Sequence, residues 1–304
     1  MNRFPTIDDY LKTPAHHSRQ AGGCHSAIKR QSSPEQPLVT INTIVRNRKN
    51  TLPQAIMSVL DQSYPNIEFI VVDGASTDGT LEVIKQFDDK IDLWISEPDR
   101  GTSDAENKAI SLGRGDLVLW LSSDDWLEPN FIELAVKAIS SSGADFVFGN
   151  MVMYKDEKIS AVVKGEKDYA KSLMSGKPLF NFPSMLIKRT CFQKIGLLGE
   201  NFKFSNDYEW TLRLHLAGGN GFYDSRLNVH RRIGGVADQH PFRGALEQVN
   251  VLRLHGLPTT KATVILLPNL VRRVVGYFAK LFLPDIIYKQ LKRPVGKGSS
   301  APLS

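Results

Sequence analysis

Apolar and polar residues form alternating blocks along the middle of the chain, and these blocks predict both strands and helices. Segments rich in Val, Ile and other apolar residues are typical of strands. They span residues 38–45, 67–72, 91–95, 117–121 and 145–148. After the first run, Leu52, Ile56, Val59 and Leu60 recur at helical spacing. Strands that alternate with helices indicate an α/β fold, in which an open twisted sheet is flanked by helices.

The two ends of the chain lack this alternation. Residues 1–36 are rich in His, Ser, Gln, Gly and Pro and show no sustained apolar periodicity, so we expect a mostly disordered arm. Residues 37–240 are predicted to form the α/β domain. Residues 241–304 are predicted to form a basic, helical C-terminal extension.

The extension contains an amphipathic helical pattern. At about 100° per residue, Arg272, Arg273 and Lys280 fall on one face of the helix, and the opposite face is apolar. This separation favours a helix that lies in a membrane interface, with contact through residues 262–293. The same apolar face could instead pack on the α/β domain, and the pattern leaves both interpretations open.

Composition and charge narrow the class of partner. The 304 residues are 41% hydrophobic and 23% charged, which is ordinary for a globular protein. The net charge of +6 is unevenly placed, because residues 251–304 carry nine Lys or Arg against one acid, whereas residues 37–250 carry more acids than bases. An acidic middle argues against nucleic-acid binding, and a basic tail favours an anionic membrane surface.

Cysteine usage and hydropathy bear on the compartment. Cys24 and Cys191 lie far apart without metal-ligand spacing, so the sequence suggests neither a disulfide framework nor a zinc site. No apolar run reaches the ~18 residues of a membrane span, and the N-terminus lacks a charged and then apolar leader. We therefore expect a cytoplasmic protein whose tail contacts the cytoplasmic face of the membrane.

Acidic residues follow three of the predicted strands. Asp73 follows the second strand, Glu97 to Asp99 follow the third, and Asp124 with Asp125 follow the fourth. Ligands of an open α/β sheet bind at these carboxyl ends. Carboxylates repel phosphate unless a divalent cation bridges the two, so the pattern predicts a nucleotide diphosphate held through a metal. Because successive strand side chains point to opposite faces, Asp124 and Asp125 can reach different partners.

Four segments resemble the family 2 glycosyltransferases, which are inverting enzymes with the GT-A fold. The segments are VVDGASTDGT (Val71–Thr80), SEPDRGTSDAENKAI (Ser96–Ile110), LSSDDW (Leu121–Trp126) and FSNDYEWTLRL (Phe204–Leu214). They resemble, in order, the family's first nucleotide-binding element, its middle segment, its DxD-type metal element and its acceptor-side segment. The resemblance covers residues 38–235 and implies a GT-A-type nucleotide-binding sheet, followed here by the helical extension.

The resemblance also implies roles for individual residues. Asp73 would hold the nucleotide base, with Thr43 beside it at the end of the first strand. Asp124 would contact the ribose or sugar of the donor, and Asp125 would coordinate Mn²⁺ or Mg²⁺. Asp207 would be the general base that takes a proton from the acceptor hydroxyl.

The middle segment implies two further donor-binding residues, Arg100 and Asp104. It also departs from the family, because relatives often have an aromatic residue and a Met where this chain has Ser103 and Glu106. A second departure is Gly74, which follows Asp73 where many members have another acid.

The resemblance implies an inverting, metal-dependent glycosyltransferase of the hexosyl or N-acetylhexosaminyl type. Its donor would be a nucleotide sugar, with a UDP-sugar expected first. Its acceptor would be a saccharide or lipid-linked saccharide in the assembly of surface polysaccharide or glycolipid. Two alternatives stay open, namely a sugar-phosphate nucleotidyltransferase and a catalytically silent scaffold of the same fold.

Overall fold

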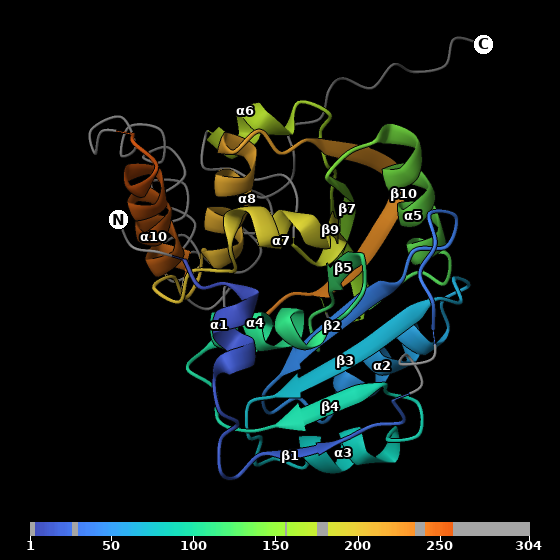
Figure 1. Cartoon of the computed structure of the whole chain (residues 1–304). Coiled ribbons are helices and arrows are strands. Elements are labelled where there is room, and N and C mark those ends of the chain that lie inside the picture. Colours follow the sequence, from blue (N-terminus) through green and yellow to red (C-terminus); the bar gives the residue numbers. More distant parts are fainter. Residues whose placement is uncertain (1–3, 26–29, 156, 175–181, 235–240, 258–304) are drawn as a thin grey trace, which may run out of the picture.

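A computed structural model describes residues 4–25, 30–155, 157–174, 182–234 and 241–257. The described residues form one ten-stranded sheet with helices on both faces (Figure 1). Its strand order is β1-β4-β3-β2-β5-β9-β7-β10-β6, and β8 pairs with β7 outside this path. The strands are β1 (Gln20–Gly22), β2 (Val39–Val45), β3 (Ile67–Asp73), β4 (Leu93–Ser96), β5 (Leu117–Trp120), β6 (Asp125–Leu127), β7 (Phe146–Lys155), β8 (Lys158–Val163), β9 (Leu186–Lys188) and β10 (Gly221–Arg232).

The helices follow the strands in the alternating pattern that the sequence predicts. They are α1 (Ile7–Lys12), α2 (Leu52–Leu60), α3 (Thr80–Gln86), α4 (Thr102–Leu112), α5 (Phe131–Ser142), α6 (Tyr169–Met174), α7 (Arg189–Ile195), α8 (Asn206–Leu216) and α10 (Pro241–Leu254). The five strands predicted from apolar runs correspond to β2, β3, β4, β5 and β7, so the α/β prediction is confirmed.

The sheet has a parallel half and a mixed half. Strands β4, β3, β2 and β5 are parallel neighbours, so their carboxyl ends meet at one edge. Strand β9 runs antiparallel to both β5 and β7, and the short β6 runs antiparallel to β10. The mixed half thereby brings β6 and its first residue, Asp125, toward the edge where the parallel strands end.

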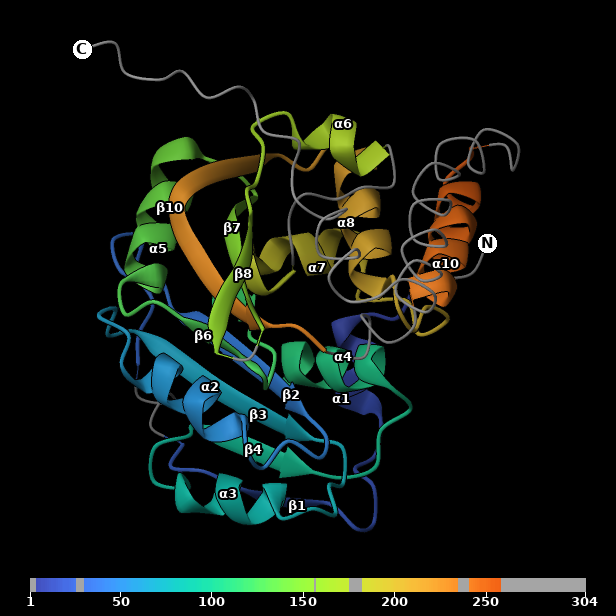
Figure 2. The same ribbon diagram turned by 180° about the vertical axis from the view of Figure 1, so that it is seen from behind.

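Each face of the sheet has its own apolar core, because neighbouring strand residues point to opposite sides. On β5, Leu117 and Leu119 pack with α2 and α5, whereas Val118 and Trp120 pack with α7 and α8. Helix α2 lies in front of β2 and β3 when the molecule is seen from behind (Figure 2). Helix α4 packs on the opposite face through Ala105 and Ala109. This double cover explains why the central strands are buried along almost their whole length.

The N-terminal segment differs from the expectation for residues 1–36. Residues 4–25 are ordered. Helix α1 has an N-terminal capping box between Thr6 and Asp9, and β1 pairs antiparallel with β4. Arg19 makes two hydrogen bonds to Glu97, of 2.6 and 2.9 Å. The prediction was wrong here because the order comes from partners distant in sequence, which local apolar periodicity does not report.

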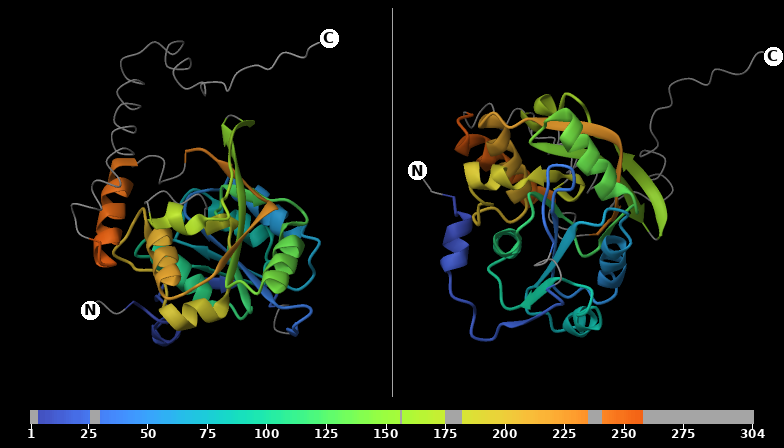
Figure 3. Two further views of the ribbon diagram at one scale, coloured as in Figure 1. Left: turned by 90° about the horizontal axis from the view of Figure 1, so that it is seen from above. Right: turned by 45° about the vertical axis from the view of Figure 1, so that its right-hand side comes forward.

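The start of the C-terminal extension packs on the α/β domain. Helix α10 lies beside α8, at the outside of the molecule (Figure 3), and buries Val251 and Leu252. Glu247 of α10 accepts hydrogen bonds from the backbone N–H groups of Lys203 and Phe204. The amphipathic pattern within 262–293 lies outside the described residues. Among the described helices, none combines the length and hydropathy needed to cross a membrane.

Candidate active site

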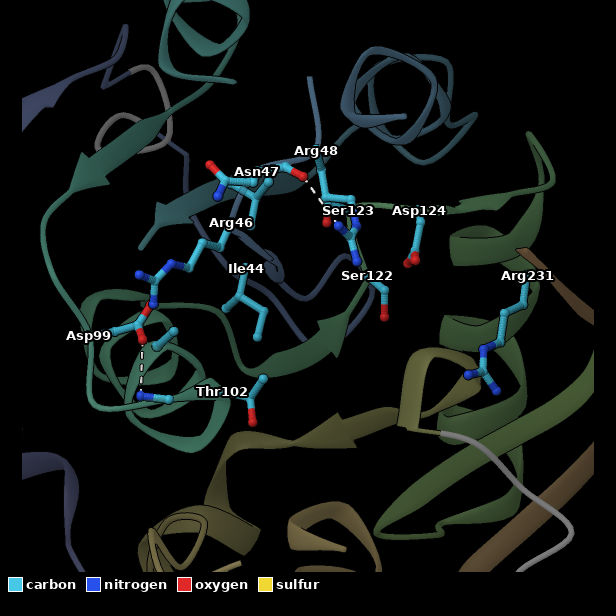
Figure 4. A pocket seen from close by; sticks show the side chains of 13 residues that line it. Ile44, Arg46, Asn47, Arg48, Asp99, Thr102, Ser122, Ser123, Asp124 and Arg231 are labelled. Atoms are coloured by element: carbon cyan, nitrogen blue, oxygen red, sulfur yellow. Dashed lines mark hydrogen bonds between the residues drawn. The ribbon is translucent and has the colours of Figure 1, made fainter. Parts of the chain in front are cut away.

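A cavity of about 580 Å³ opens at the edge where β2 and β5 end. Its walls come from the segment after β2, the start of α4, the segment after β5 and the end of β10 (Figure 4). The lining residues are Ile44, Val45, Arg46, Asn47, Arg48, Asp99, Gly101, Thr102, Ala105, Ser122, Ser123, Asp124 and Arg231. We call this the first cavity.

The first cavity contains both signs of charge. Arg46 points toward Asp99 on one side, while Arg231 and Asp124 lie on the other (Figure 4). Burial raises the pKa of Asp99, and the nearby positive charge of Arg46 opposes that rise. Asn47 takes a left-handed backbone conformation (φ 54°) and fixes the segment by accepting a hydrogen bond from Thr77 N–H at 2.9 Å. The cavity therefore offers arginine side chains to a phosphate-bearing ligand.

Asp73 and Thr43 lie on the neighbouring strands β3 and β2 but are not among the residues that line this cavity. The carboxylate of Asp73 is fully buried and accepts hydrogen bonds from Ser96 Oγ at 2.6 Å and from Ser76. The Thr43 hydroxyl is buried, and no described residue hydrogen-bonds to it. The Asp73 carboxylate therefore stabilises the loop after β3. Asp73 lies next to the region that is expected to bind the nucleotide base.

A second cavity, of about 230 Å³, adjoins the first and shares Thr102, Ser122 and Arg231 with it. Its remaining walls are largely aromatic and acidic. The lining residues are Thr102, Glu106, Trp120, Ser122, Asp125, Phe182, Pro183, Lys203, Phe204, Asn206, Asp207 and Arg231. Asp124 thus lines the first cavity and Asp125 the second, so the adjacent acids do reach different spaces.

Asp125 is only 2% exposed, and its strand partner across the sheet is Arg231. Burial, and then the charge of Asp124, raise the pKa of Asp125 well above its usual range, although Arg231 and two hydrogen bonds oppose this. Its Oδ1 atom is buried without a hydrogen-bond partner among the described residues. A buried, unpartnered carboxylate oxygen is costly, and a divalent cation would offset that cost. Asp125 therefore fits the metal-binding role.

A metal here would need ligands beyond the protein. In the described part of the chain, no three His, Cys, Asp or Glu side chains converge as a metal-binding group. Cations such as Mg²⁺ are commonly held by one or two carboxylates together with substrate phosphates and water. Asp125 lies beside the first cavity, whose arginines can bind phosphate, so its position matches this mode of metal binding.

Asp207 stands in the first turn of α8, which begins after Ser205. Burial raises the pKa of the Asp207 carboxyl, whereas a hydrogen bond from Tyr208 N–H (2.7 Å) and the charge of Arg231 act against the rise. The positive end of the helix dipole also favours the ionised form. The carboxylate faces the second cavity, where it can accept a proton from a bound hydroxyl.

Glu106 is a site residue to which the sequence motifs assign no role. It lies on α4 and shares the second cavity with Asp207. Burial and the charge of Asp207 raise the pKa of Glu106 to about 8, although a 2.9 Å hydrogen bond from Asn206 lowers it. The departure from the family at this position was visible in the sequence. The sequence alone does not show that α4 approaches the start of α8.

Arg100 and Asp104 lie outside both cavities described so far. Asp104 is buried and forms ion pairs with Arg100 (2.8 Å) and Lys108 (3.0 Å), and Arg100 also pairs with Glu200 (2.9 Å). Both line a third cavity of about 270 Å³ against the N-terminal segment. Of this stretch, Asp99, Gly101 and Thr102 reach the first cavity instead.

Comparison with known proteins identifies the family. The family model described as Glycosyl transferase family 2 matches residues 40–196, which is more than half of the chain. The chain belongs to the family 2 glycosyltransferases. This membership favours the transferase over the nucleotidyltransferase alternative.

Curated relatives of this family 2 glycosyltransferase include bacterial proteins of similar extent. An uncharacterized glycosyltransferase of Rickettsia prowazekii (strain Madrid E) is 32% identical over 70% of this chain and 69% of its own. The Escherichia coli protein WfaP, named as a UDP-Glc:α-D-GlcNAc-diphosphoundecaprenol β-1,3-glucosyltransferase, is 25% identical over 72% of this chain and 87% of its own.

Solved structures of other glycosyltransferases share the fold. TarS of S. aureus aligns with a TM-score of 0.59 and 16% identity, over 85% of this chain and 46% of the longer TarS chain. Mannosyltransferase PcManGT from Pyrobaculum calidifontis, solved with GDP-Man and Mn²⁺, aligns with a TM-score of 0.57 and 16% identity over 94% of this chain and 88% of its own. The predicted GT-A fold is thereby confirmed.

Proposed function

We propose that this family 2 glycosyltransferase moves a sugar from a nucleotide diphosphate to an acceptor hydroxyl with inversion of configuration. The observation that carries the proposal is the pair of adjoining cavities. One cavity holds Asp124 and several arginines, and the other holds Asp125 and Asp207. A transferase needs this arrangement, since donor and acceptor must meet at one boundary.

The first cavity is the proposed donor site. Arg46, Arg48 and Arg231 line it and can bind phosphate oxygens, while Asp124 can accept hydrogen bonds from ribose or sugar hydroxyls. Relatives favour a nucleotide-sugar donor, because TarS has been solved with UDP-GlcNAc and PcManGT with GDP-Man. A UDP-sugar is the first choice, in keeping with the UDP-Glc named for WfaP.

Mn²⁺ or Mg²⁺ is the proposed cofactor, and Asp125 is the residue that would hold it. When bound, the cation supplies positive charge to the diphosphate leaving group. The unpartnered Oδ1 of Asp125 supports this assignment, as does the Mn²⁺ in the PcManGT complex. Asp125 itself stays ionised in that setting because the cation offsets the cost of its burial.

Asp207 is the proposed general base. It accepts the proton of the acceptor hydroxyl as that oxygen forms a bond to the anomeric carbon, and the bond from that carbon to the diphosphate oxygen breaks. Attack from the face opposite the leaving group inverts the anomeric configuration. The electron pair of the broken bond stays on the diphosphate, and the proton stays on Asp207 until solvent removes it.

The acceptor is proposed to be a saccharide or lipid-linked saccharide used for surface polysaccharide or glycolipid. Two relatives support this setting, since WfaP is named for a diphosphoundecaprenol-linked acceptor and TuaG of Bacillus subtilis for teichuronic acid biosynthesis. Such an acceptor would place the enzyme at the cytoplasmic face of the membrane, with the basic tail as the proposed contact.

Replacement of Asp207 by Asn tests the proposal. The Asn side chain keeps the shape but cannot take the proton, so kcat should fall about 10²- to 10⁴-fold. Donor affinity, measured by calorimetry, should stay within about twofold because Asp207 does not line the donor cavity. Asp89→Asn, at an exposed position on the loop after α3, is the matched control. Unchanged turnover in Asp207→Asn would remove Asp207 as the base, and no turnover in the wild type would favour the silent scaffold.

A further inference from the structure

The second cavity contains a carboxyl that the proposed reaction does not use. Glu106 on α4 and Asp207 on α8 line the same cavity of about 230 Å³, although they are far apart in the sequence. Asn206, which directly precedes Asp207, donates a hydrogen bond to Glu106 at 2.9 Å, so the two carboxyls lie close enough for the charge of Asp207 to raise the pKa of Glu106. Asp125, which is 2% exposed and has a buried Oδ1 atom without a hydrogen-bond partner among the described residues, lines the cavity as well. These groups converge where the acceptor must lie.

Glu106 is held so that one of its two oxygens is committed to the protein. Asn206 Nδ2 donates to Glu106 Oε2 at 2.9 Å and also contacts Ser103 Oγ at 3.1 Å, which joins α4 to the start of α8. No described residue hydrogen-bonds to the other oxygen, Oε1. Asp207 is anchored in the same manner, because its Oδ1 accepts from Tyr208 N–H. Each carboxyl can therefore offer an oxygen to a ligand.

The rest of the cavity does not select for a cationic ligand. Lys203 and Arg231 offset much of the negative charge of the carboxyls of Glu106, Asp125 and Asp207, which line the same walls. A hydroxyl group both donates and accepts hydrogen bonds, so it can bind the Glu106 carboxyl in either protonation state. With a pKa near 8, Glu106 titrates close to neutral pH, and only a ligand with this dual capacity suits both forms.

We propose that Glu106 is a specificity-determining residue that binds a second hydroxyl of the acceptor, next to the hydroxyl held by Asp207. The inference rests on the proposed transferase function and deepens it. The acceptor class is then a sugar or other polyol with two neighbouring free hydroxyl groups. An acceptor that lacks the second hydroxyl leaves the Glu106 carboxyl without its partner.

The test uses the full-length protein and its Glu106→Met and Glu106→Gln variants, with Glu82→Gln at an exposed position on α3 as the control. Release of nucleoside diphosphate is measured at saturating nucleotide sugar with octyl glycosides of glucose, galactose and N-acetylglucosamine. Each glycoside is also used with single hydroxyls replaced by O-methyl groups. Release without any glycoside, in which water is the acceptor, is measured in parallel.

Glu106→Met should raise the KM for the best glycoside about 10- to 100-fold, which corresponds to one lost hydrogen bond to a charged or polar partner. Donor affinity should not change, because Glu106 does not line the first cavity, and any change in release to water should be small beside the change in KM. Glu106→Gln retains a hydrogen-bonding oxygen and should rescue most of the loss. For one of the O-methyl glycosides, the KM of the wild type should be as high as the KM of Glu106→Met for the unmodified glycoside.

Three results would overturn the inference. An unchanged KM in Glu106→Met, with glycoside-dependent release intact, would refute the role of Glu106 but leave the transferase function standing. Equal losses in Glu106→Gln and Glu106→Met would show that charge, and hence a cationic acceptor group, is what Glu106 recognises. Absence of glycoside-dependent release in the wild type, with donor binding intact, would refute a sugar hydroxyl acceptor and the inference with it.

Discussion

The ion pairs of Glu97 predict a measurable dependence of stability on pH. Glu97 is 3% exposed and precedes Asp99, which lines the first cavity, by two residues. Arg19 of the N-terminal segment contacts it at 2.6 Å, and Lys108 of α4 contacts it at 2.9 Å. Burial alone would raise the pKa of Glu97, but the hydrogen bonds from Arg19 and Lys108 outweigh this and lower it to about 2.

The shift fixes both the sign and the size of the effect. A glutamate has a pKa of about 4.3 in an unfolded chain, and each unit of difference is worth about 1.36 kcal/mol. Because the folded-state value is depressed, the ionised form contributes about 3 kcal/mol of stability at neutral pH. That contribution is complete above about pH 4.3 and is lost as the pH falls toward 2. At pH 3, about half of it remains.

Urea unfolding of the wild type and of Glu97→Gln tests this reasoning. Gln keeps the size of the side chain but does not titrate, so the variant should be less stable at pH 7 by about 3 kcal/mol. This gap in the free energy of unfolding between the wild type and the variant should be smaller at pH 3 than at pH 7 by about 1.5–2 kcal/mol. Glu82→Gln, exposed on α3, should show no pH-dependent gap. A gap for Glu97→Gln that is the same at both pH values would refute the ion-pair account.

Two other predictions concern the core and the catalytic base. Trp210 is fully buried, stacks on Phe192 with ring centroids 4.4 Å apart, and donates a hydrogen bond to Gly196 O. Trp210→Ala should therefore lower the free energy of unfolding by about 3–5 kcal/mol, and a loss below 1 kcal/mol would contradict the packing described. Burial raises the pKa of Asp207, and a base must be deprotonated, so kcat/KM should fall on the acid side at a pH above the usual carboxyl range. A rate that stays constant down to pH 4 would be incompatible with that base.

The sequence predicted the parts of the fold that local patterns specify. Val39–Val45 and Ile67–Asp73 are buried along almost their whole length, and their content of Val and Ile predicted both strands. Asp125 and Asp207 line one cavity, and in the sequence only the family resemblance of their two motifs connects them. Local patterns therefore predict the sheet, whereas the roles of the site residues stay predictions that rest on the resemblance.

Contacts between distant segments account for what the sequence did not reveal. Arg19 finds Glu97 only when β1 pairs with β4, so the order of the N-terminal segment has no local signature. Glu106 becomes a cavity residue only because α4 meets the start of α8 through Asn206. Arg100 forms an ion pair with Glu200, a residue that no motif contains, and does not line the first cavity.

The central claim is a metal-dependent donor site in which Asp125 holds the cation. The most direct test is calorimetric titration of UDP, GDP and dTDP into the protein, with Mn²⁺ and with EDTA, for the wild type and Asp125→Asn. The account predicts that one diphosphate, expected to be UDP, binds in the presence of Mn²⁺, and that EDTA or the Asp125→Asn change abolishes this binding. Binding that is equally tight in EDTA and in the variant would contradict the role of Asp125, and no binding of any diphosphate would contradict the donor site itself.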